Sequence, residues 1–240
     1  MLIDLHVHSH LTKGCDLDPR AVLERAASLG LEGVAFTETN TQDGCDELFD
    51  LQPKTPLRIF VGLELVTDRG QFLCFFPRPD QVPEPVQLWG SNREKPWSAA
   101  ESIPKVISLG AVVVAARPYD RDFPTPALDH VLTVQGLSAI EGYNARVRQP
   151  ANDLAVEAAE KLGLPCVGGS DAKLALDEVG RGATFFRDRV TSQADLLTAL
   201  RGKGYWPVMV GELPRLGRPG EAREQEKSSR KRKGFRGRFR

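Results

Sequence analysis

The chain has 240 residues, of which 41% are hydrophobic and 27% charged, a composition typical of a globular protein and not of a disordered or fibrous one. Its longest apolar stretch, Ala111 to Ala116, is too short to cross a bilayer, so we expect a cytoplasmic protein with no membrane span and no signal peptide. The four cysteines form no C-x-x-C pair, which argues against a zinc knuckle or a disulfide framework and favours reduced thiols.

The formal net charge of zero hides an uneven distribution of charge. Eight of the 32 basic residues lie between Lys227 and Arg240, a segment without acidic residues, which leaves 24 basic against 32 acidic residues in positions 1–226. Apolar residues nearly vanish from Gly217 onward. We therefore predict one folded domain over residues 1–216 and a disordered basic tail over residues 217–240.

Seven short apolar, β-rich runs alternate with helical patterns along the chain. The predicted strands are Leu2–Val7, Gly33–Thr37, Leu57–Val66, Ala111–Ala116, Leu137–Glu141, Pro165–Gly168 and Ala183–Phe186. Such alternation predicts a mainly parallel sheet, either closed into a barrel or open and doubly wound.

Cap and end signals bound the helices between these strands. Asp18 before Pro19 begins the first helix, and a later helix covers residues 150–163. Ser98 with Glu101 and Ser192 with Asp195 resemble capping boxes. Residues 77–97 contain five prolines and are predicted to form a long loop within the domain.

Two histidines and two carboxylates stand at predicted strand ends. His6 and His8 are two residues apart on a strand, where alternation directs both imidazoles to one face and allows them to bind one metal ion. Glu64 follows Val61-Gly62-Leu63 near the end of the third predicted strand, and Asp171 follows the sixth after two glycines. Taken singly, each carboxylate is better explained by a loop contact or an ion pair. The carboxyl ends of parallel strands nevertheless converge on a barrel mouth, where sites are normally built.

Taken together, these segments resemble the PHP family, the polymerase and histidinol phosphatase domain. The segments that carry the resemblance are Asp4–Ser9, Gly30–Thr37, Gly62–Glu64, Ala116–Pro118, Ile140–Glu141 and Gly169–Ala172. The resemblance covers roughly residues 1–205 and implies a distorted seven-stranded α/β barrel of metal-dependent phosphoesterases. It also implies that one divalent ion, zinc, manganese or iron, is bound by His6, His8, Glu64 and Asp171.

Other positions depart from the family pattern. Thr37-Glu38-Thr39-Asn40 stands where the family reads Thr-Asp-His-Asn, and Gln71 lies in the region of a further histidine. Arg117 replaces the histidine of Ala-His-Pro, and Lys173 replaces the histidine two residues after the Ser-Asp pair. Family members hold up to three metals, so the resemblance implies that the second and third metal sites are lost in this chain.

Two functions follow from this pattern. In the first, the chain is a one-metal phosphoesterase in which the ion activates water, while Arg117 and Lys173 neutralise a substrate phosphate. The substrate is then a phosphorylated small molecule or an oligonucleotide. In the second, the chain is a non-catalytic scaffold without metal, in which these two cations form ion pairs with Glu38, Glu64 and Asp171.

Three further features are weaker indications. Glu141 is a candidate for orienting a ligand at the barrel mouth, whereas His10 and His130 are expected to be a surface and a packing histidine. The tail from Lys227 to Arg240 combines cations with two phenylalanines. It is predicted to be either a solvated segment or a non-specific nucleic-acid contact.

Overall fold

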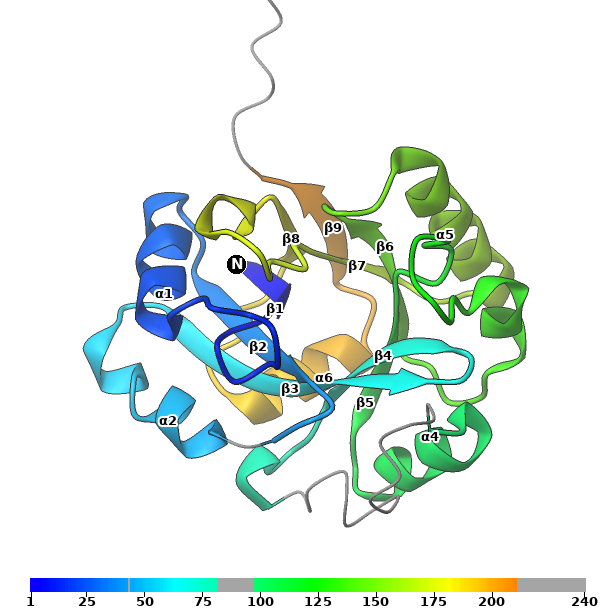
Figure 1. Ribbon diagram of the computed structural model, residues 1–240, viewed down its shortest axis with the longest axis horizontal. Helices are drawn as coiled ribbons and strands as arrows, with labels where there is room; N and C mark the ends of the chain where they lie inside the picture. Colours follow the sequence, from blue (N-terminus) through cyan, green and yellow to red (C-terminus); the bar gives the residue numbers. More distant parts are fainter. Residues whose placement is uncertain (43, 82–96, 211–240) are drawn as a thin grey trace, which may run out of the picture. The chain divides into compact units, whose positions relative to one another are not determined.

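One sheet runs through the described residues, 1–42, 44–81 and 97–210, of this computed structural model (Figure 1). Its nine strands lie in the order β7-β6-β5-β4-β3-β2-β1-β8-β9. They are β1 (Leu2–Val7), β2 (Gly33–Thr39), β3 (Arg58–Thr67), β4 (Gly70–Phe75), β5 (Val112–Ala116), β6 (Ala139–Asn144), β7 (Cys166–Gly169), β8 (Gly182–Phe186) and β9 (Tyr205–Met209). All seven predicted strands are confirmed, and β4 and β9 are additional.

Fewer strand pairs of the sheet are parallel than the alternation of strands and helices in the sequence predicted. Four neighbouring pairs are parallel (β1–β2, β2–β3, β5–β6 and β6–β7), and four are antiparallel (β1–β8, β3–β4, β4–β5 and β8–β9). The difference arises because β3 and β4 form a hairpin through Asp68 and Arg69, and a two-residue turn can join only antiparallel strands. Pro207 within β9 is a residue that sheets tolerate at an edge, which is where β9 lies.

The two ends of the sheet approach each other and nearly close the barrel. The backbone N–H of Gly168 in β7 donates to Thr184 Oγ1 in β8 (2.8 Å), and that hydroxyl donates to the Gly168 carbonyl (2.9 Å). A side chain on Gly168 would collide with the carbonyl of Ala183. Backbone hydrogen bonds also join β1 to the segment after β7, from His8 N to the Ala172 carbonyl (3.0 Å) and from Asp171 N to the His6 carbonyl (2.7 Å). The distorted α/β barrel is therefore confirmed.

Helices lie around the ring of strands, except α6, which lies behind it in the view of Figure 1. They are α1 (Pro19–Ser28), α2 (Cys45–Phe49), α4 (Ala99–Ser108), α5 (Gln149–Leu162) and α6 (Gln193–Arg201), with 3-10 turns η1 (Gln52–Lys54), η2 (Pro79–Gln81), η3 (Leu128–Thr133) and η4 (Leu176–Glu178). Within the described part of the chain, none of these helices has the length and apolarity needed to span a membrane.

The helix caps agree with the sequence patterns at two of three positions. Asp18 accepts from the backbone N–H of Arg20 (2.7 Å), and Ser192 forms the predicted capping box with Asp195. The predicted capping box at Ser98 is wrong, because that side chain makes no cap hydrogen bond. Asp68 from the β3–β4 hairpin instead accepts from the backbone N–H of Ala99 (2.8 Å) and satisfies the helix end.

Apolar side chains fill the barrel interior at the end where the parallel strands begin. One core cluster includes Leu5, Phe60, Leu73 and Val114 of four strands together with leucines of α6. Arg201 of α6 donates to the carbonyl of Gly110, just before β5 (2.9 Å), so α6 covers the amino ends of the parallel strands. The opposite end, where these strands terminate, is left for polar side chains.

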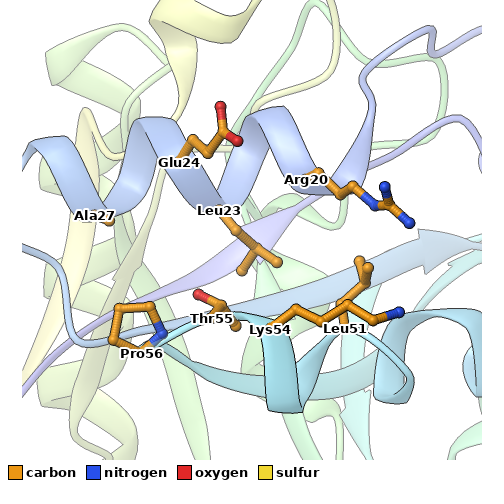
Figure 2. A pocket seen from close by; sticks show the side chains of 8 residues that line it. All are labelled: Arg20, Leu23, Glu24, Ala27, Leu51, Lys54, Thr55 and Pro56. Atoms are coloured by element: carbon orange, nitrogen blue, oxygen red, sulfur yellow. The ribbon is translucent and has the colours of Figure 1, made fainter.

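A surface cavity of about 240 Å³ lies in the outer layer of the barrel, between α1 and the segment around η1 (Figure 2). Leu23 points from α1 toward this segment, which contributes Leu51, Lys54 and Pro56. No residue that lines this cavity is among the predicted site residues.

The remaining sequence predictions concern residues 82–96 and 211–240. Most of the predicted loop 77–97 and the whole predicted tail lie outside the described residues. The domain boundary at residue 216 therefore stays a prediction.

Candidate metal centre

Four predicted site residues meet at the carboxyl ends of the parallel strands. His6 and His8 come from β1 and the residue after it, Glu64 from β3 and Asp171 from the turn after β7, and all four are at most 1% exposed. His6 Nε2 lies 3.5 Å from Glu64 Oε1 and 3.7 Å from Asp171 Oδ1. His8 Nε2 lies 3.7 Å from Glu64 Oε2 and 3.5 Å from Asp171 Oδ1.

One atom of each of these side chains is buried without a hydrogen-bond partner. The four atoms are His6 Nε2, His8 Nε2, Glu64 Oε1 and Asp171 Oδ1. Buried polar atoms are rarely left unpaired because losing water without a new partner costs about 1–3 kcal/mol or more. Ligands about 2.1 Å from a tetrahedral ion stand about 3.4 Å apart, close to the separations seen here. The donor set and its spacing therefore fit a divalent ion.

Three of the four residues form the tightest group. Ligand atoms of His6, His8 and Asp171 all lie within 4.8 Å of one another. Glu64 borders both histidines but stands outside this group. The guanidinium of Arg117 reaches both carboxylates, with Nη1 2.6 Å from Asp171 Oδ2 and Nη2 3.6 Å from Glu64 Oε1.

The second nitrogen of each imidazole is held by a polar side chain. His6 Nδ1 lies 2.9 Å from Glu141 Oε1, and a carboxylate accepts, so this nitrogen carries the proton. His8 Nδ1 lies 3.3 Å from Thr12 Oγ1, whose own proton is donated to Glu38 Oε2. When both imidazoles are neutral, the Nε2 lone pair of each ring is therefore free to point at the centre, as it does in histidines that bind a metal ion.

Glu141 also fixes the backbone beside the centre. Its Oε2 accepts from the N–H of Arg117 (2.9 Å) and from Asn144 Nδ2 (3.0 Å). A Cβ on Gly169 would lie 2.5 Å from His6 Cβ and 2.9 Å from Glu141 Oε1, so only glycine fits at that position. The role that the sequence analysis assigned to Glu141, orienting a ligand, corresponds here to a hydrogen bond with the His6 ring.

Glu38 is satisfied by hydroxyl and backbone donors. Its Oε1 accepts from Ser9 N (3.1 Å) and Ser9 Oγ (2.6 Å), and its Oε2 accepts from Thr12. Thr39 Oγ1 donates to Glu64 Oε2 (2.8 Å). Glu38 therefore requires no cation, and it acts on the centre through Thr12 and His8.

Arg117 and Gln71 contact each other although 46 residues separate them. Arg117 Nε donates to Gln71 Oε1 (2.6 Å), and the guanidinium stacks over Phe123 with 5.0 Å from Cζ to the ring centroid. Both residues stand where the family resemblance places histidines of a second metal. The two substitutions are thus mutually compatible, because one supplies the donor and the other the acceptor.

Of the two cations predicted at the barrel mouth, Arg117 pairs with the carboxylates of the centre and Lys173 does not. Lys173 is partly exposed, and among the described residues its ammonium forms no ion pair, so the predicted pairing with Glu38, Glu64 or Asp171 is absent. Its backbone N–H donates to Glu178 Oε2 (2.9 Å). Arg146, which the sequence analysis did not select, donates from Nη1 to the Asp171 carbonyl (3.3 Å). The sequence could have indicated Arg146 through its position, two residues after Asn144 at the carboxyl end of β6.

Charge in this centre is unbalanced when no ion is bound. Burial lowers the pKa of His6, but Glu141, Asp171 and Glu64 outweigh burial and raise it well above 6.5. Burial raises the pKa of Glu64, yet His6, His8 and Arg117 lower it to about 2. The pKa of Asp171 also lies well below its usual range because His6, His8 and Arg117 outweigh its burial. A proton on His6 thus supplies positive charge that a divalent ion would replace.

Backbone conformation at the centre is strained at two positions. Arg117 (φ 31°) and Asp171 (φ 52°) both lie in the left-handed region that side chains rarely adopt. Such residues cluster at functional sites, where surrounding contacts hold them. Here Glu141 holds the N–H of Arg117, and the carbonyl of His6 accepts from the N–H of Asp171 (2.7 Å).

The fold and this centre define an α/β-barrel protein with a buried histidine and carboxylate cluster suited to a metal ion. Comparison with known proteins specifies the family. Residues 149–203 match the family model described as PHP-associated. An uncharacterized protein of Methanocaldococcus jannaschii is 30% identical over 129 residues, which cover 50% of this chain and 68% of that protein. The chain belongs to the PHP family.

Solved structures share the fold at low sequence identity. A two-domain protein of Bacteroides vulgatus containing a predicted PHP-like metal-dependent phosphoesterase aligns with a TM-score of 0.68 and 16% identity, over 88% of this chain and 65% of that one. The chain thus spans about two thirds of that protein. PsfC of Pseudomonas syringae aligns with a TM-score of 0.62 and 20% identity, over 94% of this chain and 98% of that one. An amidohydrolase of Chromobacterium violaceum, with bound sulfate and no metal, aligns with a TM-score of 0.58 and 17% identity, over 82% of this chain and 96% of that one.

Proposed function

We propose that this protein is a metal-dependent phosphoesterase with one divalent ion, zinc, manganese or iron, bound by His6, His8, Glu64 and Asp171. The observation that carries the proposal is that each of these four residues has one buried atom without a hydrogen-bond partner, and that these atoms lie close together at the barrel mouth. An ion at this position would act as a Lewis acid and activate water for attack on phosphorus.

The remaining residues of the mouth bind and orient. Arg117 presents a guanidinium within 2.6 Å of Asp171, and Arg146 donates to the carbonyl of the same residue, so a phosphate at the centre would meet positive charge on two sides. Lys173, partly exposed and without an ion pair among the described residues, adds a further positive charge. Phosphorylated small molecules and oligonucleotides both carry the phosphate that these positive charges would bind.

The non-catalytic scaffold is the second candidate, and Arg117 favours it. Its guanidinium lies between Glu64 and Asp171 and neutralises part of the buried negative charge without any metal. Against this alternative, only one guanidinium among the described residues, that of Arg117, pairs with the two carboxylates, although the scaffold function predicts two cations there. Four acceptor and donor atoms stay unsatisfied beside it.

Metal analysis of the purified, untagged protein, followed by a phosphatase screen, separates the two functions. We expect about one transition metal per chain and hydrolysis of phosphomonoesters or short oligonucleotides that a chelator abolishes. The scaffold function predicts no metal after loading with zinc and manganese, and no turnover. Either of these two results would reject the proposal.

The double variant Gln71→His with Arg117→His tests the number of metals. Both residues stand at positions of lost histidines and contact each other, so restoring both imidazoles removes the guanidinium and adds two ligands beside Glu64. Metal content should rise from about one to about two per chain. The single variant Gln71→His, which keeps Arg117, is the control and should stay at about one. A wild-type protein that already holds two or three metals contradicts the proposed site.

A further inference from the structure

A second cavity, of about 280 Å³, lies between the loop after β5 and the first turns of α5. Its apolar lining comes from Tyr119 of the β5 loop and from Val147, Pro150, Ala151 and Leu154 around the start of α5. Leu154 is 42% exposed although it is a large apolar residue. An apolar lining that stays open to solvent is a feature of sites that receive ligands.

Two residues that line this cavity, Asp120 and Val147, adjoin residues of the metal centre. Asp120 lines it, and Asp120 Oδ2 lies 3.8 Å from Nη1 of Arg117. On the other wall, Val147 lines the cavity and its neighbour Arg146 donates to the Asp171 carbonyl. A group in the cavity would therefore lie about one side chain away from a phosphate held by the two guanidinium groups.

The charges around the cavity cancel. Two carboxylates, Asp120 and Asp122, and two guanidinium groups, Arg121 and Arg148, line it, and Arg148 Nη2 forms an ion pair with Asp122 Oδ2 at 3.0 Å on the exposed rim. A charged leaving group gains nothing from a neutral lining, whereas an uncharged apolar group gains from burial against the leucine, valine and tyrosine. The lining thus favours the apolar end of a substrate.

We propose that this cavity binds the uncharged, apolar alcohol portion of a phosphomonoester whose phosphate occupies the metal centre. The inference rests on the proposed function and names its substrate class. In the reaction, the oxygen of water bonds to phosphorus, the bond between phosphorus and the alcohol oxygen breaks, and that oxygen takes a proton. The alcohol leaves from the cavity, and inorganic phosphate leaves from the centre.

The test compares 2-phenylethyl phosphate with ethyl phosphate, two primary alkyl esters that differ in the apolar group. The variant is Leu154→Glu, which places a carboxylate in the lining. The matched control is Val156→Glu on the same helix, since Val156 is 37% exposed and does not line the cavity. The wild type should favour 2-phenylethyl phosphate in kcat/KM, and Leu154→Glu should reduce that preference about 10-fold while Val156→Glu preserves it.

Binding of 2-phenylethanol, followed by saturation-transfer NMR, makes the result independent of turnover. The wild type and Val156→Glu should bind the alcohol, and Leu154→Glu should not. Binding with this pattern but no phosphatase activity would support the subsite and reject the proposed function. Equal kcat/KM for the two esters with no alcohol binding would overturn the subsite, as would a preference for 2-carboxyethyl phosphate over both esters.

Discussion

The imidazole of His8 is fixed through a chain of polar contacts that begins at Glu38. Glu38 accepts from Thr12, which leaves the Thr12 oxygen to accept from His8 Nδ1 and directs Nε2 toward Asp171 and Glu64. His6 is fixed in the same way by Glu141. Each ring is therefore oriented by residues that do not themselves reach the centre.

Replacing His8 by alanine should remove the bound metal. The change removes one of the two imidazoles and brings two carboxylates into mutual repulsion, so the remaining three ligands bind a transition metal more weakly. Metal content should fall from about one per chain to near zero by elemental analysis. His10→Ala is the matched control, because His10 is an exposed histidine 3.6 Å from Glu47, away from the centre. Retention of metal by His8→Ala would show that other residues bind it.

Acid should destabilise the metal-free protein through Glu64. Its pKa falls from 4.5 to about 2 on folding, so the unfolded chain binds this proton more tightly than the folded protein. The contribution to the free energy of unfolding is complete above about pH 4.5 and is lost as pH falls toward about 2. In urea titrations between these values, Glu64→Gln should show a weaker pH dependence than the wild type. Glu24→Gln, on the exposed face of α1, should keep the full dependence, and a wild-type slope in Glu64→Gln would contradict the assignment.

At the scale of elements, helix starts show how local and distant groups compete for the same backbone donors. The N-terminus of α6 is capped by its own Ser192, as the local sequence indicates. The N-terminus of α4 has Ser98 at the same position, but Asp68 of the β3–β4 hairpin supplies the acceptor. The hairpin thus positions α4 as well as β4, the strand that carries Gln71 into the site.

Ser192→Ala should lower the free energy of unfolding by about 1 kcal/mol, since it removes the hydroxyl that accepts from the N–H of Asp195. Ser98→Ala is the matched control and should change it by less than about 0.5 kcal/mol, because its side chain makes no cap bond. Urea unfolding of both variants measures the difference. Equal losses would show that Ser98 caps its helix in solution.

At the scale of the whole molecule, the barrel places its chemistry at one end and its apolar core at the other. The carboxyl ends of the strands hold the histidines and carboxylates, while α6 and the leucines beneath it cover the amino ends. Closure of the barrel brings Asp171 beside His6, because the N–H of Asp171 donates to the His6 carbonyl (2.7 Å) and the N–H of His8 donates to the Ala172 carbonyl (3.0 Å).

The basic segment from Lys227 to Arg240 should bind nucleic acid without sequence preference. Eight cations in fourteen residues can neutralise phosphates, and the slope of log affinity against log salt could approach ~7 on duplex DNA. Deleting residues 227–240 should abolish binding in a fluorescence anisotropy titration across salt concentrations. Unchanged affinity of the shortened chain would reject this role.

Much of the barrel and of the candidate site was predictable because its signals are local. Strand periodicity, the caps at Asp18 and Ser192, and two histidines at strand spacing depend on residues a few positions apart. The resemblance carried by short motifs added Glu64 and Asp171. These local patterns determined the seven predicted strands and which side chains stand at the strand ends.

Tertiary structure alone decided how those side chains are paired. Arg117 contacts Gln71 and Asp171 across 46 and 54 residues, whereas Lys173 forms no ion pair with the described residues and Glu38 is satisfied by hydroxyl groups. Which partner a buried charge finds depends on distances set by the packing of separate strands, and local sequence contains no information on these distances. The same reason explains why β4, Arg146 and the cavity beside Leu154 became visible only in the folded chain.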